Sequence, residues 1–94
     1  MPIEALRGEV SRIDREIIRL IAKRQQLANQ IARVKHTEGL PIHDENRTKE
    51  VLDYAFEYAV EQKINPVSVQ EIFSILIQMS EERQRERMGE GNLP

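Results

Sequence analysis

The sequence predicts an all-α protein of three helices per chain, the first of them very long. Three observations carry this prediction: one long run with apolar residues every three or four positions, two shorter runs with the same periodicity, and breaks at glycine or proline between them. With 94 residues, the chain is expected to form one domain over 1–94. A chain this short buries little apolar surface alone and gains from association.

The first helix is predicted over residues 3–36. At 1.5 Å per residue it would be roughly 50 Å long, which a domain of this size cannot enclose. Its apolar seam must therefore project and needs a partner, so we expect an intertwined homodimer. The seam consists of Ile3, Leu6, Val10, Ile13, Ile17, Leu20, Leu27, Ile31 and Val34.

Two further helices are predicted over residues 45–62 and 66–88. Gly39 and Pro41 end the first helix, since glycine suits a left-handed cap and proline cannot continue the backbone ladder. Asp44 is a good N-cap for the second helix, and Asn65-Pro66 is a typical start for the third. Residues 89–94 are expected to be a flexible tail.

Composition excludes several classes of function. The net charge is −2, with acids and bases interspersed, so nothing favours binding to nucleic acid or to an anionic membrane. The absence of cysteine excludes disulfides, thiolate nucleophiles and Cys-ligated metals, and His36 and His43 lack the spacing of metal ligands. No signal peptide or membrane span is recognisable, and we expect a cytoplasmic protein without metal or cofactor.

Arg24 interrupts the seam of the first helix. It stands where the next apolar residue after Leu20 is expected. It could snorkel to water or pair with a glutamate. Alternatively, it could act with Lys35, which points within about 20° of it and lies roughly 16 Å along the axis. Two cations above small side chains could bind a dianion the size of a substituted ring.

The third helix changes character near its end. The stripe that begins with Phe73 and Ile77 continues with Ser80 and Gln84. Such a helix could simply be leaving the core for solvent. The other interpretation is that two neutral hydrogen-bonding groups point into a pocket.

Together these positions resemble the all-helical class of chorismate mutases, from Leu6 to Gln84. The long first helix of that family is similar to LRGEVSRIDREIIRLIAKRQQLANQIARVK, which places Arg7, Ile13-Asp14, Arg24 and Lys35 at matching intervals. The proline-containing loop is similar to LPIHDENR, with Asp44 and Arg47. The third-helix signature is similar to IFSILIQMSEERQ, with Phe73, Ser80 and Gln84.

The resemblance implies an isomerase that converts chorismate to prephenate, in the shikimate pathway that leads to phenylalanine and tyrosine. It implies that Arg24 and Lys35 bind the substrate carboxylates, with Ser80 contacting one of them. Lys35 and Gln84 would donate to the ether oxygen. The catalytic set would be Arg7, Arg24, Lys35 and Gln84, and the remaining substrate contacts Asp44, Arg47, Thr48 and Ser80.

Arg7 is implied to reach the active site of the other subunit. Helix geometry supports this independently, because Arg7 lies about 25 Å along the axis from Arg24 and some 100° around it. One straight helix cannot bring both to the same small molecule, so two chains must share each site if both arginines function there.

Thr48 is a departure from the family pattern, which commonly has glutamate directly after the loop arginine. Threonine is shorter and neutral, although it can still hydrogen-bond. Related isochorismate pyruvate-lyases also tend to lack that glutamate, so this activity is an alternative. A non-catalytic helical dimerisation or regulatory module is a second alternative, although such an interface would favour Leu or Ile at position 24.

Overall fold

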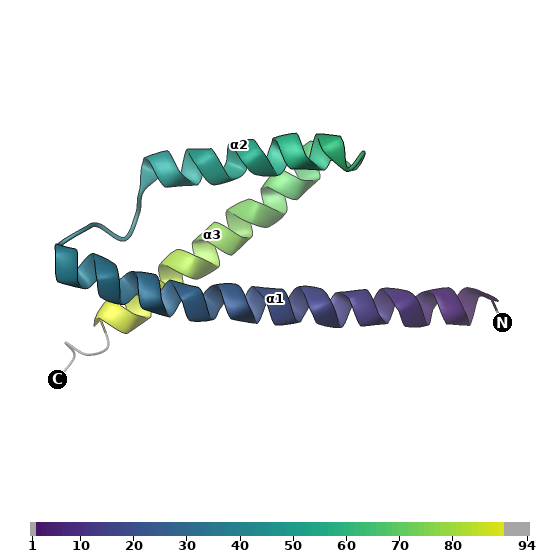
Figure 1. The fold of residues 1–94 in the computed structure, drawn as a ribbon, viewed down its shortest axis with the longest axis horizontal. Helices are drawn as coiled ribbons and strands as arrows, with labels where there is room; N and C mark the ends of the chain where they lie inside the picture. The colour runs from purple at the N-terminus through teal and green to yellow at the C-terminus, as the bar shows by residue number, and fades with distance from the viewer. Residues whose placement is uncertain (1, 90–94) are drawn as a thin grey trace.

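The computed structural model describes residues 2–89, and in that range it contains three helices and no strand (Figure 1). Helix α1 spans Pro2–Glu38, α2 spans Glu45–Glu61 and α3 spans Pro66–Gly89. The all-α prediction is confirmed, and the predicted ends of the helices are within two residues of those observed. The predicted tail overlaps α3 at Gly89, and its other residues, 90–94, lie outside the described part.

The predicted caps fix where the helices start and stop. Oδ1 of Asp44 accepts a hydrogen bond from the backbone N–H of Arg47 at 3.0 Å, at the start of α2. Oδ1 of Asn65 accepts from the N–H groups of Val67 and Ser68, at the start of α3. Gly39 ends α1 with φ of 68°.

Lys63, directly after α2, has a backbone conformation that glycine usually adopts. Its φ is 61°, and the N–H groups of Lys63 and Ile64 donate to the carbonyls of Val60 and Ala59. This is the hydrogen-bond pattern of a Schellman motif, in which the left-handed residue is most often glycine. Lysine here places a Cβ in a strained position.

Helix α3 packs against both α1 and α2, whereas α1 and α2 do not pack against each other. The apolar residues that α1 and α2 bury at these contacts are small. The buried apolar residues are Ala28 and Ala32 of α1, with Val51, Ala55 and Ala59 of α2. The core of a single chain is therefore a thin layer of alanine and valine.

The N-terminal half of α1 extends away from the other two helices (Figure 1). The radius of gyration is 16.8 Å, against about 12 Å for a compact domain of this length. The predicted seam residues of α1 are all exposed within the single chain, by 45% at Ile31 up to 60% at Leu6. None of the helices in the described range is both long and apolar enough to cross a membrane.

Candidate active site

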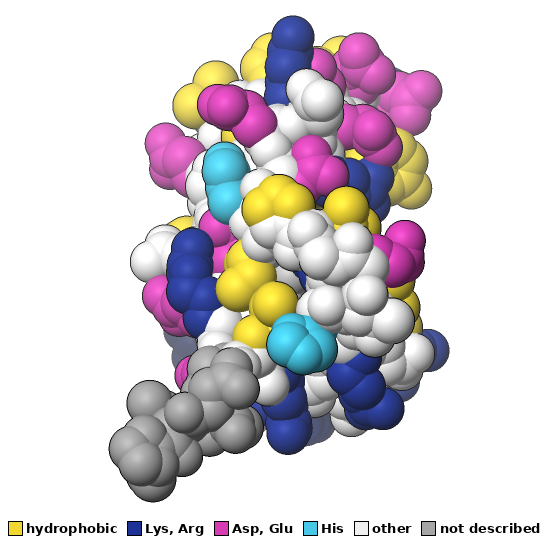
Figure 2. Space-filling view, turned by 90° about the vertical axis from the view of Figure 1, so that its left-hand side faces the viewer, with side chains coloured by type: hydrophobic (Ala, Val, Ile, Leu, Met, Phe, Trp, Pro, Cys, Tyr) yellow, Lys and Arg dark blue, Asp and Glu magenta, His cyan; other side chains and the backbone are white. Residues whose placement is uncertain are grey.

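A cavity of about 350 Å³ lies where the three helices and the loop between α1 and α2 come together. Seven of the eight predicted site residues line it: Arg24, Lys35, Asp44, Arg47, Thr48, Ser80 and Gln84. Its other walls are Leu27, Ile31, Ile42, Val51, Tyr54, Ile77 and Glu81. Figure 2 views the molecule from the end at which α1 stops and α2 begins, and it shows hydrophobic side chains bordered by charged side chains of both signs.

A chain of hydrogen bonds joins α1 to α3 across the cavity. Nζ of Lys35 donates to Oε1 of Gln84 at 2.8 Å, and Nε2 of Gln84 donates to Oγ of Ser80 at 3.0 Å. Gln84 is only 4% exposed, which shows that α3 does not leave the core at this point. The polar end of α3 therefore faces the cavity. This agrees with the interpretation that Ser80 and Gln84 point into a pocket, and not with a helix that leaves the core for solvent.

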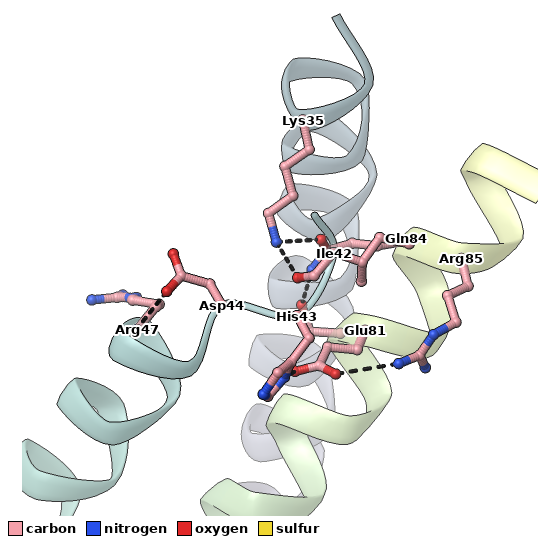
Figure 3. A network of polar contacts seen from close by, with 9 residues as sticks. Lys35, Ile42, His43, Asp44, Arg47, Glu81, Gln84 and Arg85 are labelled. Carbon is pink, nitrogen blue, oxygen red and sulfur yellow. Dashed lines mark hydrogen bonds and ion pairs between the residues drawn. The ribbon is translucent and has the colours of Figure 1, made fainter. Parts of the chain in front are cut away.

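Lys35 and Gln84 each retain a hydrogen-bond donor. Lys35 has three ammonium hydrogens and also donates to the carbonyl oxygen of Ile42 (Figure 3). Gln84 has two amide hydrogens, of which Ser80 accepts one. Among the described residues, these contacts leave one hydrogen on each group. The pair can thus present two donors to one acceptor atom bound between them.

The start of α2 supplies the third side of the site. The capping bond of Asp44 holds its carboxylate at this helix N-terminus, where the helix dipole favours a negative charge. Arg47 reaches outward, and its guanidinium pairs with Glu50 at 2.6 Å. Thr48 is half-buried and borders the cavity. The expected contacts of these three residues with a substrate stay predictions.

Arg24 is half-buried and donates from Nη1 to the carbonyl oxygen of Leu76 at 3.1 Å. No carboxylate within 4.0 Å pairs with it among residues 2–89. Among these residues, Arg24 therefore does not pair with a glutamate, which was one of the interpretations that the sequence left open. The guanidinium lines the cavity and keeps further N–H donors for an anion.

Arg7 does not border the cavity of its own chain. It lies on the projecting half of α1, which is one uninterrupted helix from Pro2 to Glu38. The geometric expectation that one helix cannot bring Arg7 and Arg24 together is thus met. The transfer of Arg7 to a partner's site stays a prediction.

Four cavity features were not predicted from the sequence: the carbonyl of Ile42, the His43–Glu81 contact, and the side chains of Tyr54 and Glu81. A main-chain acceptor in a loop leaves no mark in the residue pattern. Glu81 follows Ser80 directly, and a carboxylate next to a predicted anion site was the one available signal.

The cavity is suited to binding an anion and stabilising charge. Arg24, Lys35 and Arg47 bring positive charge, against the carboxylates of Asp44 and Glu81. No group of three metal-ligating side chains occurs among the described residues. The exposed pair Glu16 and Arg19 lies away from the cavity, and its hydrogen bond lowers the pKa of the Glu16 carboxyl and raises the pKa of the Arg19 guanidinium.

The family model for chorismate mutase type II matches residues 6–85. The chain belongs to this family. A chorismate mutase from Methanocaldococcus jannaschii is 32% identical over 85 residues, which cover 90% of this chain and 86% of that protein. A bifunctional chorismate mutase/prephenate dehydratase from Aquifex aeolicus is 41% identical over 51 residues, 54% of this chain but only 14% of that protein.

A solved structure is also similar to this chain in fold and in sequence. A conserved hypothetical protein from Pyrococcus furiosus matches with a TM-score of 0.75 and 34% sequence identity. The match covers 90% of this chain and 97% of that one. The similarity to this protein therefore extends to the arrangement of the three helices.

Proposed function

We propose that this chain is a chorismate mutase, an isomerase that rearranges chorismate to prephenate for the biosynthesis of phenylalanine and tyrosine. The observation that carries the proposal is the contact between Lys35 and Gln84 at the wall of a cavity lined by seven predicted site residues. We further propose that it acts in the cytoplasm.

The chemistry fits this residue set. The rearrangement is pericyclic, so it needs no nucleophile and no proton transfer to the protein. Negative charge grows on the ether oxygen as the C–O bond breaks. Lys35 and Gln84, each with one hydrogen left, can donate to that oxygen, and positioned donors of this kind act mainly in the transition state. Losing one such donor typically costs about 10²–10³-fold in rate.

The two carboxylates of chorismate need cations and neutral donors. Arg24 and Lys35 offer charged donors in the cavity, and Ser80 offers a hydroxyl. Holding both carboxylates freezes the flexible enolpyruvyl group close to its reactive conformation. Asp44, Arg47 and Thr48 lie at the remaining side, where we place the ring hydroxyl.

A homodimer completes the proposed site. The exposed apolar seam of α1 should be buried against a partner, because an apolar face this long is uncommon on a monomer. In a twofold dimer, Arg7 of the partner subunit would enter each cavity and add a second arginine for a carboxylate. Each dimer would then hold two equivalent sites.

The test is an assay of purified protein with chorismate, followed by loss of its diene absorbance and by detection of prephenate. We expect prephenate in stoichiometric yield and no pyruvate. A parallel assay with isochorismate identifies the lyase alternative, which releases pyruvate. Turnover of neither substrate would favour the non-catalytic module and would refute the proposal.

A further inference from the structure

Glu81 places a carboxylate in the wall of a cavity that is built for an anion. Its side chain is only 16% exposed, and it lies on α3 between Ser80 and Gln84. A carboxylate free to turn here would repel a dianionic substrate and could pair directly with Lys35. Burying like charges side by side is costly, so something must restrain this group.

Both oxygens of Glu81 are engaged away from Lys35. Oε2 lies 3.0 Å from Nδ1 of His43, and Oε1 lies 3.4 Å from Nη2 of Arg85. An ionised carboxylate only accepts hydrogen bonds, so Nδ1 of His43 must carry the hydrogen. Figure 3 shows the Glu81 carboxylate directed at these two groups, and within the described range no ion pair of 4.0 Å or less joins it to Lys35.

His43 lies in the loop between α1 and α2, and this loop contacts all three helices. The carbonyl of Ile42 accepts from Lys35 of α1, the ring of His43 contacts Glu81 of α3, and Asp44 caps α2. The histidine therefore approaches Glu81 from the loop, whereas Arg85 approaches it from one turn further along α3. Together they hold the carboxylate from two sides.

We propose that His43 and Arg85 are positioning residues that hold the Glu81 carboxylate out of the substrate's anion site. The inference rests on the proposed function, because the anion is chorismate. Without His43, the Glu81 side chain turns toward Lys35 and occupies its remaining hydrogen. Substrate must then displace an internal ion pair, which weakens binding of the ground state and of the transition state alike. The effect falls on KM and not on kcat.

The experiment compares steady-state kinetics with chorismate for the dimeric wild type and for His43→Ala, Glu81→Gln and the double variant. We expect His43→Ala to raise KM by about 10-fold, the factor that one lost charge-assisted contact can produce, with kcat within about 3-fold. Glu81→Gln alone should match or lower the wild-type KM. Adding Glu81→Gln to His43→Ala should return KM to within about 3-fold of wild type, because the neutral amide no longer competes as an anion.

Conservative and control variants separate this role from anchoring of the loop. His43→Asn keeps a side-chain N–H donor and should retain a near-normal KM. His36→Ala removes the other, exposed histidine near the end of α1 and should change neither constant. Arg85→Ala should raise KM in the same direction by about 2- to 3-fold, as expected for a longer contact (3.4 Å against 3.0 Å), and Glu81→Gln should reverse this too. If His43→Ala does not fold, Arg85→Ala alone and combined with Glu81→Gln still test the proposal.

The outcomes are distinct. An unchanged KM in folded His43→Ala overturns the proposal, and so does a raised KM that Glu81→Gln fails to lower, since that result assigns His43 to the loop alone. A wild type that does not turn over chorismate overturns the proposed function itself. Circular dichroism and light scattering establish that each variant is folded and of wild-type association state.

Discussion

The ammonium group of Lys35 lies 2.8 Å from the amide oxygen of Gln84, although 49 positions of sequence separate the two residues. The contact joins the last turns of α1 to the C-terminal part of α3. It also fixes the direction of both side chains, so that their remaining hydrogens can serve one acceptor. Stabilisation of the ether oxygen in our proposal depends on this pair.

Replacing Gln84 with glutamate should make turnover depend on pH. The wild-type kcat/KM should be nearly flat from about pH 6 to 9, because no protein group gains or loses a proton in the reaction. The carboxyl group introduced by Gln84→Glu donates only when protonated, and its ionised form repels the charge growing on the ether oxygen. Its activity should therefore survive at low pH and fall as pH rises through the pKa of the new carboxyl, whose reference value is about 4.3.

The measurement is a pair of kcat/KM profiles on samples that remain associated across the range. A bell-shaped wild-type profile centred near neutrality would indicate acid–base catalysis. A Gln84→Glu profile that matches wild type would show that the amide does not face the reacting oxygen.

Replacing Thr48 with glutamate should increase kcat/KM for chorismate. Thr48 is half-buried, borders the cavity and lies within the first turn of α2, where the helix dipole favours a negative charge. A carboxylate that accepts from the ring hydroxyl should raise kcat/KM by about 2- to 10-fold, the range of one net hydrogen bond. A large loss of chorismate turnover, with the helical spectrum intact, would show instead that the threonine hydroxyl has its own role.

Replacing Lys63 with glycine should stabilise the fold without affecting the site. The left-handed backbone at Lys63, with φ of 61°, costs a side-chain-bearing residue about 1–2 kcal/mol, and part of this is offset by the greater freedom of glycine in the unfolded chain. The net gain should be about 0.5–1 kcal/mol in urea unfolding. Lys63 does not line the cavity, so kcat/KM should stay at the wild-type value. A loss of stability would mean that this turn is not strained.

Placing a charge on the seam of α1 should prevent association. Ile13 is 58% exposed in the single chain and lies on the projecting half of the helix. In Ile13→Glu, a carboxylate would be buried at the proposed interface without a partner, so light scattering should give the mass of one chain, and turnover should be lost. The matched control is Arg15→Glu, about 200° around the helix from Ile13, which should leave the wild-type mass. If Ile13→Glu associated as wild type does, the seam would not be the interface.

The helices, and the cavity residues Arg24 and Gln84, could be predicted because each leaves a local mark in the sequence. Caps such as Asp44 and Gly39 mark helix ends within a few residues, and Arg24 is conspicuous because a cation is costly in an apolar seam. Gln84 is similarly conspicuous, since it continues an apolar stripe with an amide. Such interruptions of a regular pattern are what the sequence displays most clearly.

The rest depends on packing between distant segments. His43 and Glu81 are 38 positions apart and belong to separate segments, a loop and a helix, so no periodicity links them. The acceptor of Ile42 is its main-chain carbonyl, which every residue has, so the residue type does not indicate it. The partner of Arg24 proved to be the carbonyl of Leu76 for the same reason, since any residue at that position offers this oxygen.

If two chains build each active site, as we propose, complementation between Arg7→Ala and Arg24→Ala tests this most directly. Each variant alone should be nearly inactive as a homodimer, because every site lacks one arginine. After co-refolding in equal amounts, half of the dimers are mixed and each carries one intact site, so activity should recover to about one quarter of wild type. If mixed dimers are shown to form and the sample stays as inactive as its parents, the two arginines do not meet across chains and the shared site is contradicted.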